Sequence, residues 1–125
     1  MKNLPCPCDN TREYAACCQL LHEGQAAATA EALMRSRYSA YVLRLEDYLQ
    51  ATWHETTRPD APILPPAGQV KWLRLKVLAH RQTDDSHAEV QFTARYIEAG
   101  RHGQMTELSR FVKENGRWLY LDGDY

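Results

Sequence analysis

The spacing of apolar side chains divides the chain into a helical half and a strand-rich half. Between Thr29 and Leu45, apolar and aromatic residues recur at the three-to-four-residue interval of one helix face. Thr29 is a good N-terminal cap, and Glu31 in the first turn suits the helix dipole. A shorter apolar repeat predicts a second helix over residues 46–52. These patterns predict helices that pack on a core by one face.

From residue 72 onward the pattern changes to alternation between apolar and polar positions. Residues 72–79 and 88–96 predict two strands, each with one apolar face; in the first, Leu73 shares that face with Leu75. Two more stretches complete an antiparallel meander, and the Asn-Gly dipeptide between them is a strong signal for a tight hairpin turn. These last strands are predicted over residues 105–113 and 118–122. The sequence therefore predicts an α+β fold, with helices packed on a four-stranded antiparallel sheet.

Proline and glycine mark the connections between these elements. The prolines within residues 56–68 exclude a helix or a central strand and predict a long irregular loop. Residues 83–86 and 100–103 predict the turns that separate the first three strands. A loop as long as 56–68 in a compact domain is often functional, so the residues beside it are candidates for a site.

Composition and charge exclude several classes of function. The chain has 125 residues and a formal net charge of −1, from 15 basic and 16 acidic side chains. This balance gives no electrostatic basis for non-specific nucleic-acid binding, so no nucleic-acid partner is expected. No apolar run approaches the ~18 residues of a membrane-spanning helix, and the N-terminus lacks the apolar stretch of a signal peptide. We expect a cytoplasmic protein with no membrane partner.

All four cysteines lie in one short window near the N-terminus. Cys6 and Cys8 flank a proline, and Cys17 and Cys18 are adjacent. Four such thiolates can form a closed tetrahedral zinc site, with Zn–S distances of about 2.3 Å. Vicinal cysteines seldom bridge, and a cytoplasmic chain keeps its thiols reduced, which disfavours disulfides. We expect zinc on these four cysteines, with His22 as an alternative to Cys18; disulfides, redox-active thiols and unligated cysteines are the other interpretations.

The cysteine spacing resembles the SEC-C zinc motif, which occurs at the C-terminus of the bacterial secretion ATPase SecA and in many small bacterial proteins. A typical motif has Gly-Ser-Gly-Lys after its second cysteine, whereas this chain has Asp9-Asn10-Thr11-Arg12. Asparagine and aspartate tolerate left-handed backbone better than most residues, so we expect the turn to form without glycine. The departure bears on any partner recognition that depends on this loop.

Longer stretches of the chain resemble the YchJ family. The resemblance implies a domain similar to the nuclear transport factor 2-like fold, in which a curved sheet wraps around helices to form a cone that often encloses a pocket. Some proteins of that fold are enzymes and others only bind or dimerise, so the fold does not decide the function. We expect a zinc-binding motif over residues 1–24 and a cone-like domain over residues 25–125. The stretches that carry the resemblance are residues 29–42, 52–59, 109–111 and 118–123.

Charged and aromatic side chains at core-facing positions are candidates for a pocket. Arg37 falls inside the apolar arc of the first helix, where it either pairs within the core or faces an anionic ligand in a pocket. We expect Glu107 to form a structural ion pair with Arg37 or Arg35, in preference to catalysis. His54 is the best acid–base candidate because imidazole titrates near neutral pH. The candidate pocket residues are Arg35, Arg37, Tyr38, Tyr41, Trp53, His54, Trp72 and Glu107.

Two functions follow from these features. The leading hypothesis is a zinc-binding adaptor whose cysteine motif contacts a protein partner, since the SEC-C motif of SecA contacts protein partners. Four protein ligands would leave no open position on the metal, which argues against catalytic zinc. The alternative is a small-molecule-binding protein or enzyme that uses a polar and aromatic pocket in the cone-like domain. The sequence defines neither a reaction nor an oligomeric state, and a dimer is compatible with it.

Overall fold

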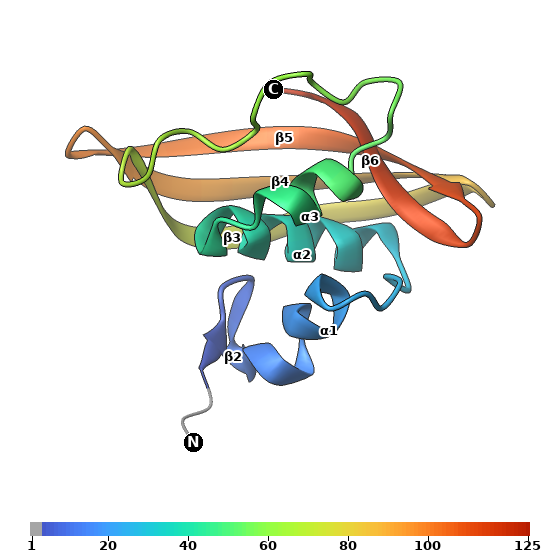
Figure 1. Ribbon diagram of the computed structural model, residues 1–125, viewed down its shortest axis with the longest axis horizontal. Coiled ribbons are helices and arrows are strands. Elements are labelled where there is room, and N and C mark those ends of the chain that lie inside the picture. The colour runs from blue at the N-terminus through green and yellow to red at the C-terminus, as the bar shows by residue number, and fades with distance from the viewer. Residues whose placement is uncertain (1–3) are drawn as a thin grey trace.

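The computed structural model describes residues 4–125, in which helices cover one face of a curved four-stranded antiparallel sheet (Figure 1). The strand order is β3-β4-β5-β6, and each strand pairs with the next in the chain. The predicted α+β meander is therefore confirmed. The strands are Val70–Asp84 (β3), His87–Glu98 (β4), Arg101–Glu114 (β5) and Arg117–Asp124 (β6).

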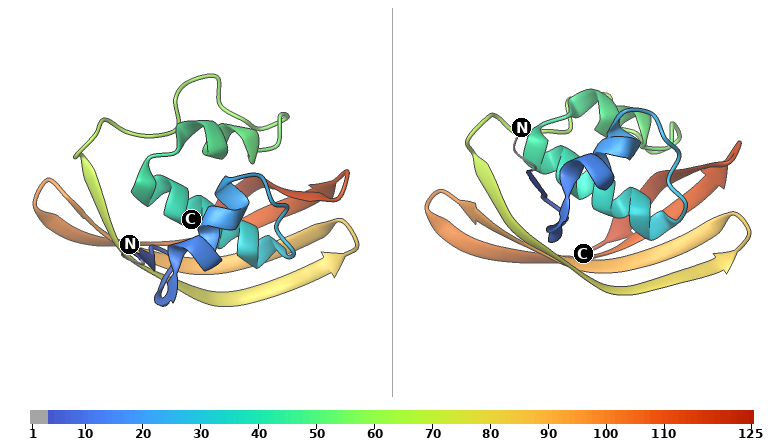
Figure 2. Two further views of the ribbon diagram at one scale, coloured as in Figure 1. Left: turned by 60° about the horizontal axis from the view of Figure 1, so that its bottom comes forward. Right: turned by 90° about the horizontal axis from the view of Figure 1, so that it is seen from below.

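Helix α2, Ala30–Leu43, lies across the face around which the sheet curves (Figure 2). The Thr29 hydroxyl accepts a hydrogen bond from the Ala32 N–H at 3.0 Å, as a capping threonine does. Arg44 ends the helix in the left-handed conformation, with φ of 60°, and helix α3, Glu46–Ala51, follows at once. Apolar side chains of α2 pack on the sheet in one cluster with residues of β4, β5 and β6, including Leu33, Met34, Val90, Phe111 and Trp118.

A further layer of short elements packs against α2 at the side of the β3 edge of the sheet (Figures 1 and 2). The apolar repeat predicted only the sheet-facing side of α2, yet Ser36, Ser39 and Ala40 are also fully buried. Their small side chains allow the N-terminal segment to approach the helix closely. The elements of this layer are β1 (Pro5–Cys6), β2 (Asp9–Glu13), the 3-10 helix η1 (Tyr14–Ala16) and α1 (Cys18–His22).

Strand β3 departs from simple alternation. Its pairing with β4 shifts register between Trp72 and Arg74 and again between Val77 and Ala79. Each shift adds one residue to β3, which reverses the faces of the residues that follow. Trp72 therefore packs with Leu75 on the helix side, while Leu73 is 42% exposed. The prediction that Leu73 shares a face with Leu75 is wrong for this reason.

The turn between β4 and β5 lies at residues 99–100, and not over the predicted residues 100–103. Ala99 and Gly100 adopt positive φ values of 52° and 76°, and β5 begins at the next residue. Gly103 is therefore part of the strand, opposite Tyr96. A Cβ atom at Gly103 would lie 2.6 Å from the Tyr96 ring, so this glycine is required for close approach and not for a turn.

The predicted loop after α3 is irregular as expected, and α3 anchors it. The N–H groups of Ile63 and Leu64 each donate to the Glu46 carboxylate at 3.0 Å. The Arg44 guanidinium donates to the Pro65 carbonyl at 2.8 Å. Within residues 4–125, none of the helices has the length and apolar character needed to span a bilayer.

Candidate metal centre and adjoining cavity

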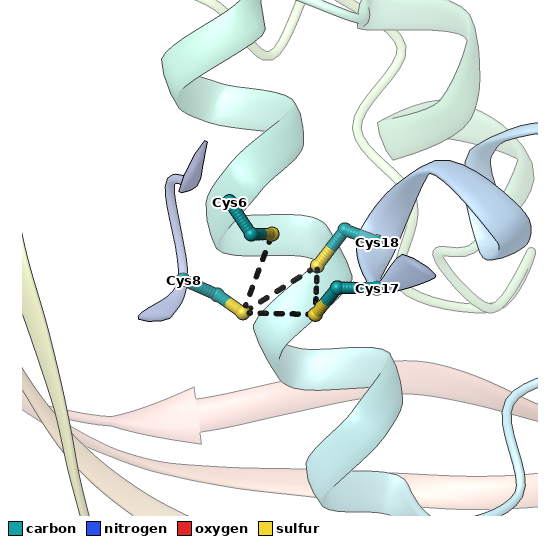
Figure 3. Close-up of side chains that lie close together, drawn as sticks. All are labelled: Cys6, Cys8, Cys17 and Cys18. Atoms are coloured by element: carbon teal, nitrogen blue, oxygen red, sulfur yellow. Dashed lines mark hydrogen bonds between the residues drawn. The ribbon is translucent and has the colours of Figure 1, made fainter. Parts of the chain in front are cut away.

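The four cysteine sulfurs converge beside α2 (Figure 3). The Cys8 Sγ atom lies 3.6 Å from the Sγ atoms of Cys6, Cys17 and Cys18, and the Cys17 and Cys18 sulfurs are 4.0 Å apart. A tetrahedral site with Zn–S distances of about 2.3 Å requires sulfur–sulfur separations of about 3.8 Å. A disulfide would require about 2.05 Å, so the four thiols are unbridged. The spacing matches a tetrahedral four-thiolate metal site.

The β1–β2 hairpin positions the first two cysteines. Cys6 pairs with Asp9 across the hairpin, and the Asp9 carboxylate accepts hydrogen bonds from the Thr11 N–H at 3.0 Å and hydroxyl at 2.7 Å. Among residues 4–125, the non-glycine residues with positive φ are Arg44, Ala99 and Asn115. The loop that lacks the usual glycines therefore closes through aspartate hydrogen bonds, and not through the left-handed backbone that we expected.

Adjacent cysteines reach one centre because the backbone turns sharply between η1 and α1. The Cys17 N–H donates to the Tyr14 carbonyl at 3.0 Å, and Cys17 has φ and ψ of −130° and −112°, outside the helical region. Cys18 is the first residue of α1. This change of direction brings the Cys17 and Cys18 sulfurs to the same side, where both can bind the same metal ion.

Helix α2 supplies contacts around the sulfurs. The Ser39 hydroxyl donates to the Cys18 Sγ atom at 3.2 Å and lies 3.6 Å from the Cys6 Sγ atom. Arg35 donates to the Cys8 carbonyl at 3.3 Å and pairs with Glu31 at 3.0 Å. Arg35 was a candidate for the pocket, but the structure places it beside the cysteines. Such outer contacts orient metal ligands and stabilise their charge.

The electrostatics of the cluster favour a cation. Hydrogen bonds from the neighbouring thiols, that of Cys18 first, lower the pKa of Cys8 to about 6. Burial first, and then the Cys8 charge, raise the pKa of Cys17 to about 11, and the hydrogen bond with Cys8 raises the pKa of Cys18. One thiolate therefore forms easily, and it opposes ionisation of the others. A divalent cation is the partner that allows all four to ionise together.

His22 does not take the place of Cys18 as a metal ligand, which was the alternative that we considered. Its Nδ1 atom accepts a hydrogen bond from the Tyr14 hydroxyl at 2.6 Å, and its Nε2–H donates to the Ser36 carbonyl at 2.8 Å. Both ring nitrogens are thus engaged away from the sulfurs. The imidazole fastens α1 to α2, and burial lowers its pKa.

A cavity of about 260 Å³ lies between α2 and the sheet. Its lining is mostly aromatic and aliphatic. Ser109, Tyr120 and Tyr125 also line it, although no sequence pattern indicated them as pocket residues. Arg35 and His54 do not. The candidate residues that line the cavity are Arg37, Tyr38, Tyr41, Trp53, Trp72 and Glu107.

Arg37 is buried at the edge of this cavity. Its Nη1 group donates to the Leu49 carbonyl at 2.9 Å and to the Thr52 hydroxyl at 2.6 Å. The guanidinium carbon lies 5.3 Å and 4.8 Å from the ring centres of Trp53 and Tyr120. Within residues 4–125 no carboxylate oxygen lies within 4.0 Å of it. The expected ion pair with Glu107 is therefore wrong, because carbonyl, hydroxyl and aromatic groups surround the cation instead.

Glu107 is also buried, on β5, and hydroxyl groups compensate its carboxylate. The Oε2 atom accepts hydrogen bonds from Ser109 at 2.7 Å and from Tyr120 at 2.8 Å. Burial first, and then the adjacent Glu107 charge, raise the pKa of Tyr120, so its hydroxyl remains a donor. The carboxylate lies over Gly123 of β6, where any Cβ atom would collide with it.

His54 lies outside the cavity and is held by a partner that the sequence did not indicate. Its Nε2–H donates to the Glu114 carboxylate at 2.7 Å, and its Nδ1 atom accepts from the Thr56 hydroxyl at 2.7 Å. Glu114 is 60 positions away in the chain, and only the β5–β6 hairpin brings it there. These contacts hold the imidazole in position at the start of the long loop, which is a structural role.

Comparison with known proteins identifies the family. The sequence model of the YchJ middle NTF2-like domain matches residues 29–123, which is most of the chain. The chain belongs to the YchJ family. A UPF0225 protein of Bordetella pertussis is 53% identical over 95% of this chain and 91% of its own, and one of Polaromonas naphthalenivorans is 49% identical over 96% of each. The predicted family is confirmed.

Two solved structures with a similar fold cover both the cysteine segment and the domain. The solution structure of a SEC-C motif containing protein from Rhodopseudomonas palustris has a TM-score of 0.83 and 32% identity, over 97% of this chain and 98% of that chain. The crystal structure of a SEC-C motif containing protein from Psychrobacter arcticus has a TM-score of 0.78 and 30% identity, over 98% of this chain and 81% of that chain. The N-terminal segment of this member of the YchJ family thus has counterparts in both.

Proposed function

We propose that Cys6, Cys8, Cys17 and Cys18 bind one Zn²⁺ as a closed structural site. The observation that carries this proposal is the set of sulfur separations, 3.6 Å from Cys8 to each other sulfur. The donor set supports zinc in particular, because four thiolates in tetrahedral geometry are its usual structural environment. With four protein ligands, no position is left for a substrate or a water nucleophile.

The role of this zinc is to hold the N-terminal segment on the domain. Cys6, Cys8 and Cys18 are buried and pack in one cluster with Tyr38 of α2 and Ala94 of β4. A metal in this cluster would fix β1, η1 and α1 against α2. Residues 4–24 bury little other apolar surface, so metal binding replaces a hydrophobic core of their own.

Zinc K-edge absorption spectroscopy tests the site directly. On protein purified without added metal, a closed four-cysteine zinc site requires four sulfur neighbours at about 2.3 Å and no lighter ligand. A mixed sulfur and nitrogen or oxygen shell would overturn the closed four-cysteine site. The same sample, treated with a chelator, should show increased amide hydrogen exchange in residues 4–24 before the sheet is affected.

The exposed side of this segment supports the adaptor function. Strand β2 is largely exposed from Asn10 to Glu13, and Leu20 of α1 is 42% exposed. We expect a protein partner to contact this side. A photo-crosslinking residue at Arg12 should capture the partner in cells, whereas one at Arg101, in the β4–β5 hairpin, should not. Equal capture at both positions, or none at Arg12, would contradict the adaptor function.

The cavity supports a second candidate function, small-molecule binding. The observation that favours it is Arg37, a buried cation that lines the cavity and has no carboxylate partner within residues 4–125. The ion pair that would have made this arginine purely structural is not formed. The zinc centre and this cavity share α2, so one helix connects the two features.

A further inference from the structure

The face of the sheet turned away from α2 is shaped by the two register shifts of β3. Within the part of the chain that the structure describes, no helix or loop covers this outer face (Figure 2). At the first shift, Leu73 and Arg74 both lie opposite Arg95 of β4, and at the second, Leu78 is the additional residue. A bulge places two consecutive residues on the same side of a strand. Both leucines therefore face outwards, where they are 42% and 47% exposed.

Three cations gather on the outer face between these leucines. Arg74, Lys76 and Arg95 are exposed, and all three line one shallow hollow in this face. Arg74 and Arg95 are direct partners in the β3–β4 ladder, and like charges in that position repel each other. We call this surface the basic patch; its residues are Leu73, Arg74, Lys76, Leu78 and Arg95.

No acidic side chain compensates the cations of the basic patch. In the described chain, no carboxylate oxygen lies within 4.0 Å of any of the three. The neighbouring arginines of the same face differ in this respect. Arg81 pairs with Glu89 at 2.8 Å, and Arg110 pairs with Asp122 and Asp124. The repulsion within the basic patch is therefore left for a bound anion to offset.

The dimensions of the basic patch suit an extended peptide. From Leu73 to Leu78 it follows β3 for about 17 Å, at ~3.3 Å per residue. An extended segment of about six residues has this length, whereas a single phosphate group would reach only part of the patch. The cations lie in the middle and the exposed leucines at the two ends. Acidic residues flanked by aliphatic residues are the complementary sequence.

The composition of the basic patch disfavours other anionic partners. The aromatic side chains of β3 and β4 lie on the opposite face, where Trp72 and Phe92 line the cavity and Tyr96 contacts the Trp72 ring at 5.5 Å between ring centres. Sheets that bind single-stranded nucleic acid stack its bases on exposed aromatic rings, and membrane interfaces favour tryptophan and tyrosine. A symmetric contact with a second copy would place one basic patch against another.

We propose that the basic patch binds an acidic, extended segment of a protein partner. Carboxylates of the segment pair with Arg74, Lys76 and Arg95, and they offset the repulsion between the two arginines. Aliphatic side chains at the ends of the segment cover Leu73 and Leu78. No residue of the cysteine segment takes part. The proposal therefore goes beyond the zinc-binding adaptor function, and its test is independent of the crosslinking test of that function.

The test uses the full chain as purified and three hexapeptides with blocked ends, at an ionic strength of about 0.1 M. The first peptide is Leu-Asp-Glu-Asp-Glu-Leu, the second replaces its acids with asparagine and glutamine, and the third replaces its leucines with alanine. Backbone amide NMR signals of residues 73–78 and 93–95 report binding, and those of residues 18–22 are the internal control. The first peptide should bind with a Kd of about 1 mM or less, and the neutral peptide at least about tenfold more weakly. Since the formal net charge of the chain is −1, attraction of an acidic peptide reports on the patch and not on the total charge.

The remaining outcomes each decide between partners. If the neutral peptide binds as well as the acidic one, the proposal is overturned; if the alanine peptide does, the contacts with the two leucines are overturned. A single-stranded RNA of ten nucleotides, or vesicles that contain phosphatidylserine, would overturn the choice of a protein partner by binding the same residues more tightly than the acidic peptide. Shifts of the patch signals on dilution of the protein alone would identify an interface between copies instead. No shift with any probe would also overturn the proposal.

A charge reversal separates binding from a structural role. Arg74→Glu should weaken binding of the acidic peptide at least about fivefold, while Tm stays the same or rises because the new carboxylate can pair with Arg95. Arg81→Glu is the matched control: it makes the same change of charge on β3, about 16 Å beyond Lys76 and so outside the Debye length of ~10 Å. Unchanged affinity in Arg74→Glu, or an equal loss in both variants, would overturn the assignment. Should Arg74→Glu fail to fold, the comparison of acidic and neutral peptides on wild-type protein still tests the charge requirement.

Discussion

The Ser39 hydroxyl on α2 donates a hydrogen bond to the Cys18 sulfur across 3.2 Å, and it thereby connects the central helix directly to the cysteine cluster. Both residues are fully buried. A donor at this position stabilises the thiolate over the thiol, because hydrogen bonding favours the charged form. The candidate metal centre is therefore built from the N-terminal segment and α2 together.

Replacing Ser39 tests this contact. Ser39→Ala should keep one zinc per chain but weaken zinc affinity about 10- to 100-fold, the usual effect of removing an outer contact to a metal ligand. Competition with a chromogenic chelator measures the affinity. Ser109→Ala is the matched control, since it removes a buried serine hydroxyl that bonds Glu107 instead. An affinity unchanged in Ser39→Ala, or lowered equally in both variants, would show that the contact has no role in metal binding.

Replacing a ligand should have a larger and more local effect. Cys8→Ser should lose the metal, because Cys8 is the sulfur closest to all three others. Hydrogen exchange should then increase most in residues 4–24. Arg12→Ala, an exposed change on the same hairpin, should keep the zinc and the protection. Retention of a full zinc equivalent by Cys8→Ser would mean that the ligand assignment is wrong.

The His22 imidazole predicts a pH dependence of stability. Burial lowers its pKa below the usual value of about 6.5, and protonation at Nδ1 would also remove the acceptor for the Tyr14 hydroxyl. Below pH ~6.5 the unfolded chain then takes up more protons than the folded chain, so folding free energy is lost as the pH falls towards the folded pKa. Above pH ~6.5 the imidazole is neutral in both states, and its hydrogen bonds contribute fully to the free energy of unfolding.

This dependence is measured by chemical denaturation at pH 7.5 and 5.5. The difference in free energy of unfolding between wild type and His22→Gln should shrink at the lower pH. The comparison with His102→Gln, an exposed position on β5, controls for other titrating groups, and its difference should be the same at both pH values. A difference for His22→Gln that is constant or grows at pH 5.5 would contradict a neutral, buried imidazole.

The contact between Glu107 and Gly123 predicts a coupled pair of substitutions. A Cβ atom at position 123 would collide with the Glu107 carboxylate, so Gly123→Ala should destabilise the fold by about 1–3 kcal/mol, a typical overpacking cost. For a domain of this size, each kcal/mol lowers Tm by about 4 °C. In a Glu107→Ala background most of that cost should disappear, because the colliding group is absent. If the two substitutions had additive effects on the free energy of unfolding, the Glu107 side chain would not lie over position 123.

Local sequence patterns predicted most of the fold. Thr29 caps α2 as expected, and Asn115-Gly116 forms the β5–β6 turn with φ values of 53° and 78°. These features depend on a few neighbouring residues, so the sequence contains what is needed to find them. The cysteine spacing also predicted the cluster, since all four cysteines lie within one short segment.

Features that depend on long-range geometry were not predictable in the same way. Alternation in β3 could not reveal the register shift between Trp72 and Arg74 that places Trp72 on the helix side with Leu75. Nothing near His54 in the sequence points to Glu114, and the Arg37 site depends on carbonyl and aromatic groups from α3, the following loop and β6. The small residues Ser36, Ser39 and Ala40 were an available signal that a second layer covers α2.

The most direct measurement is native mass spectrometry of protein purified without added metal, with a count of reactive thiols on the same sample. A structural four-cysteine zinc site predicts one zinc ion per chain and four cysteines that react only after chelation. A chain that contains no metal, with thiols that react freely or oxidise reversibly, would contradict a structural zinc centre and favour a redox role for the cysteine cluster.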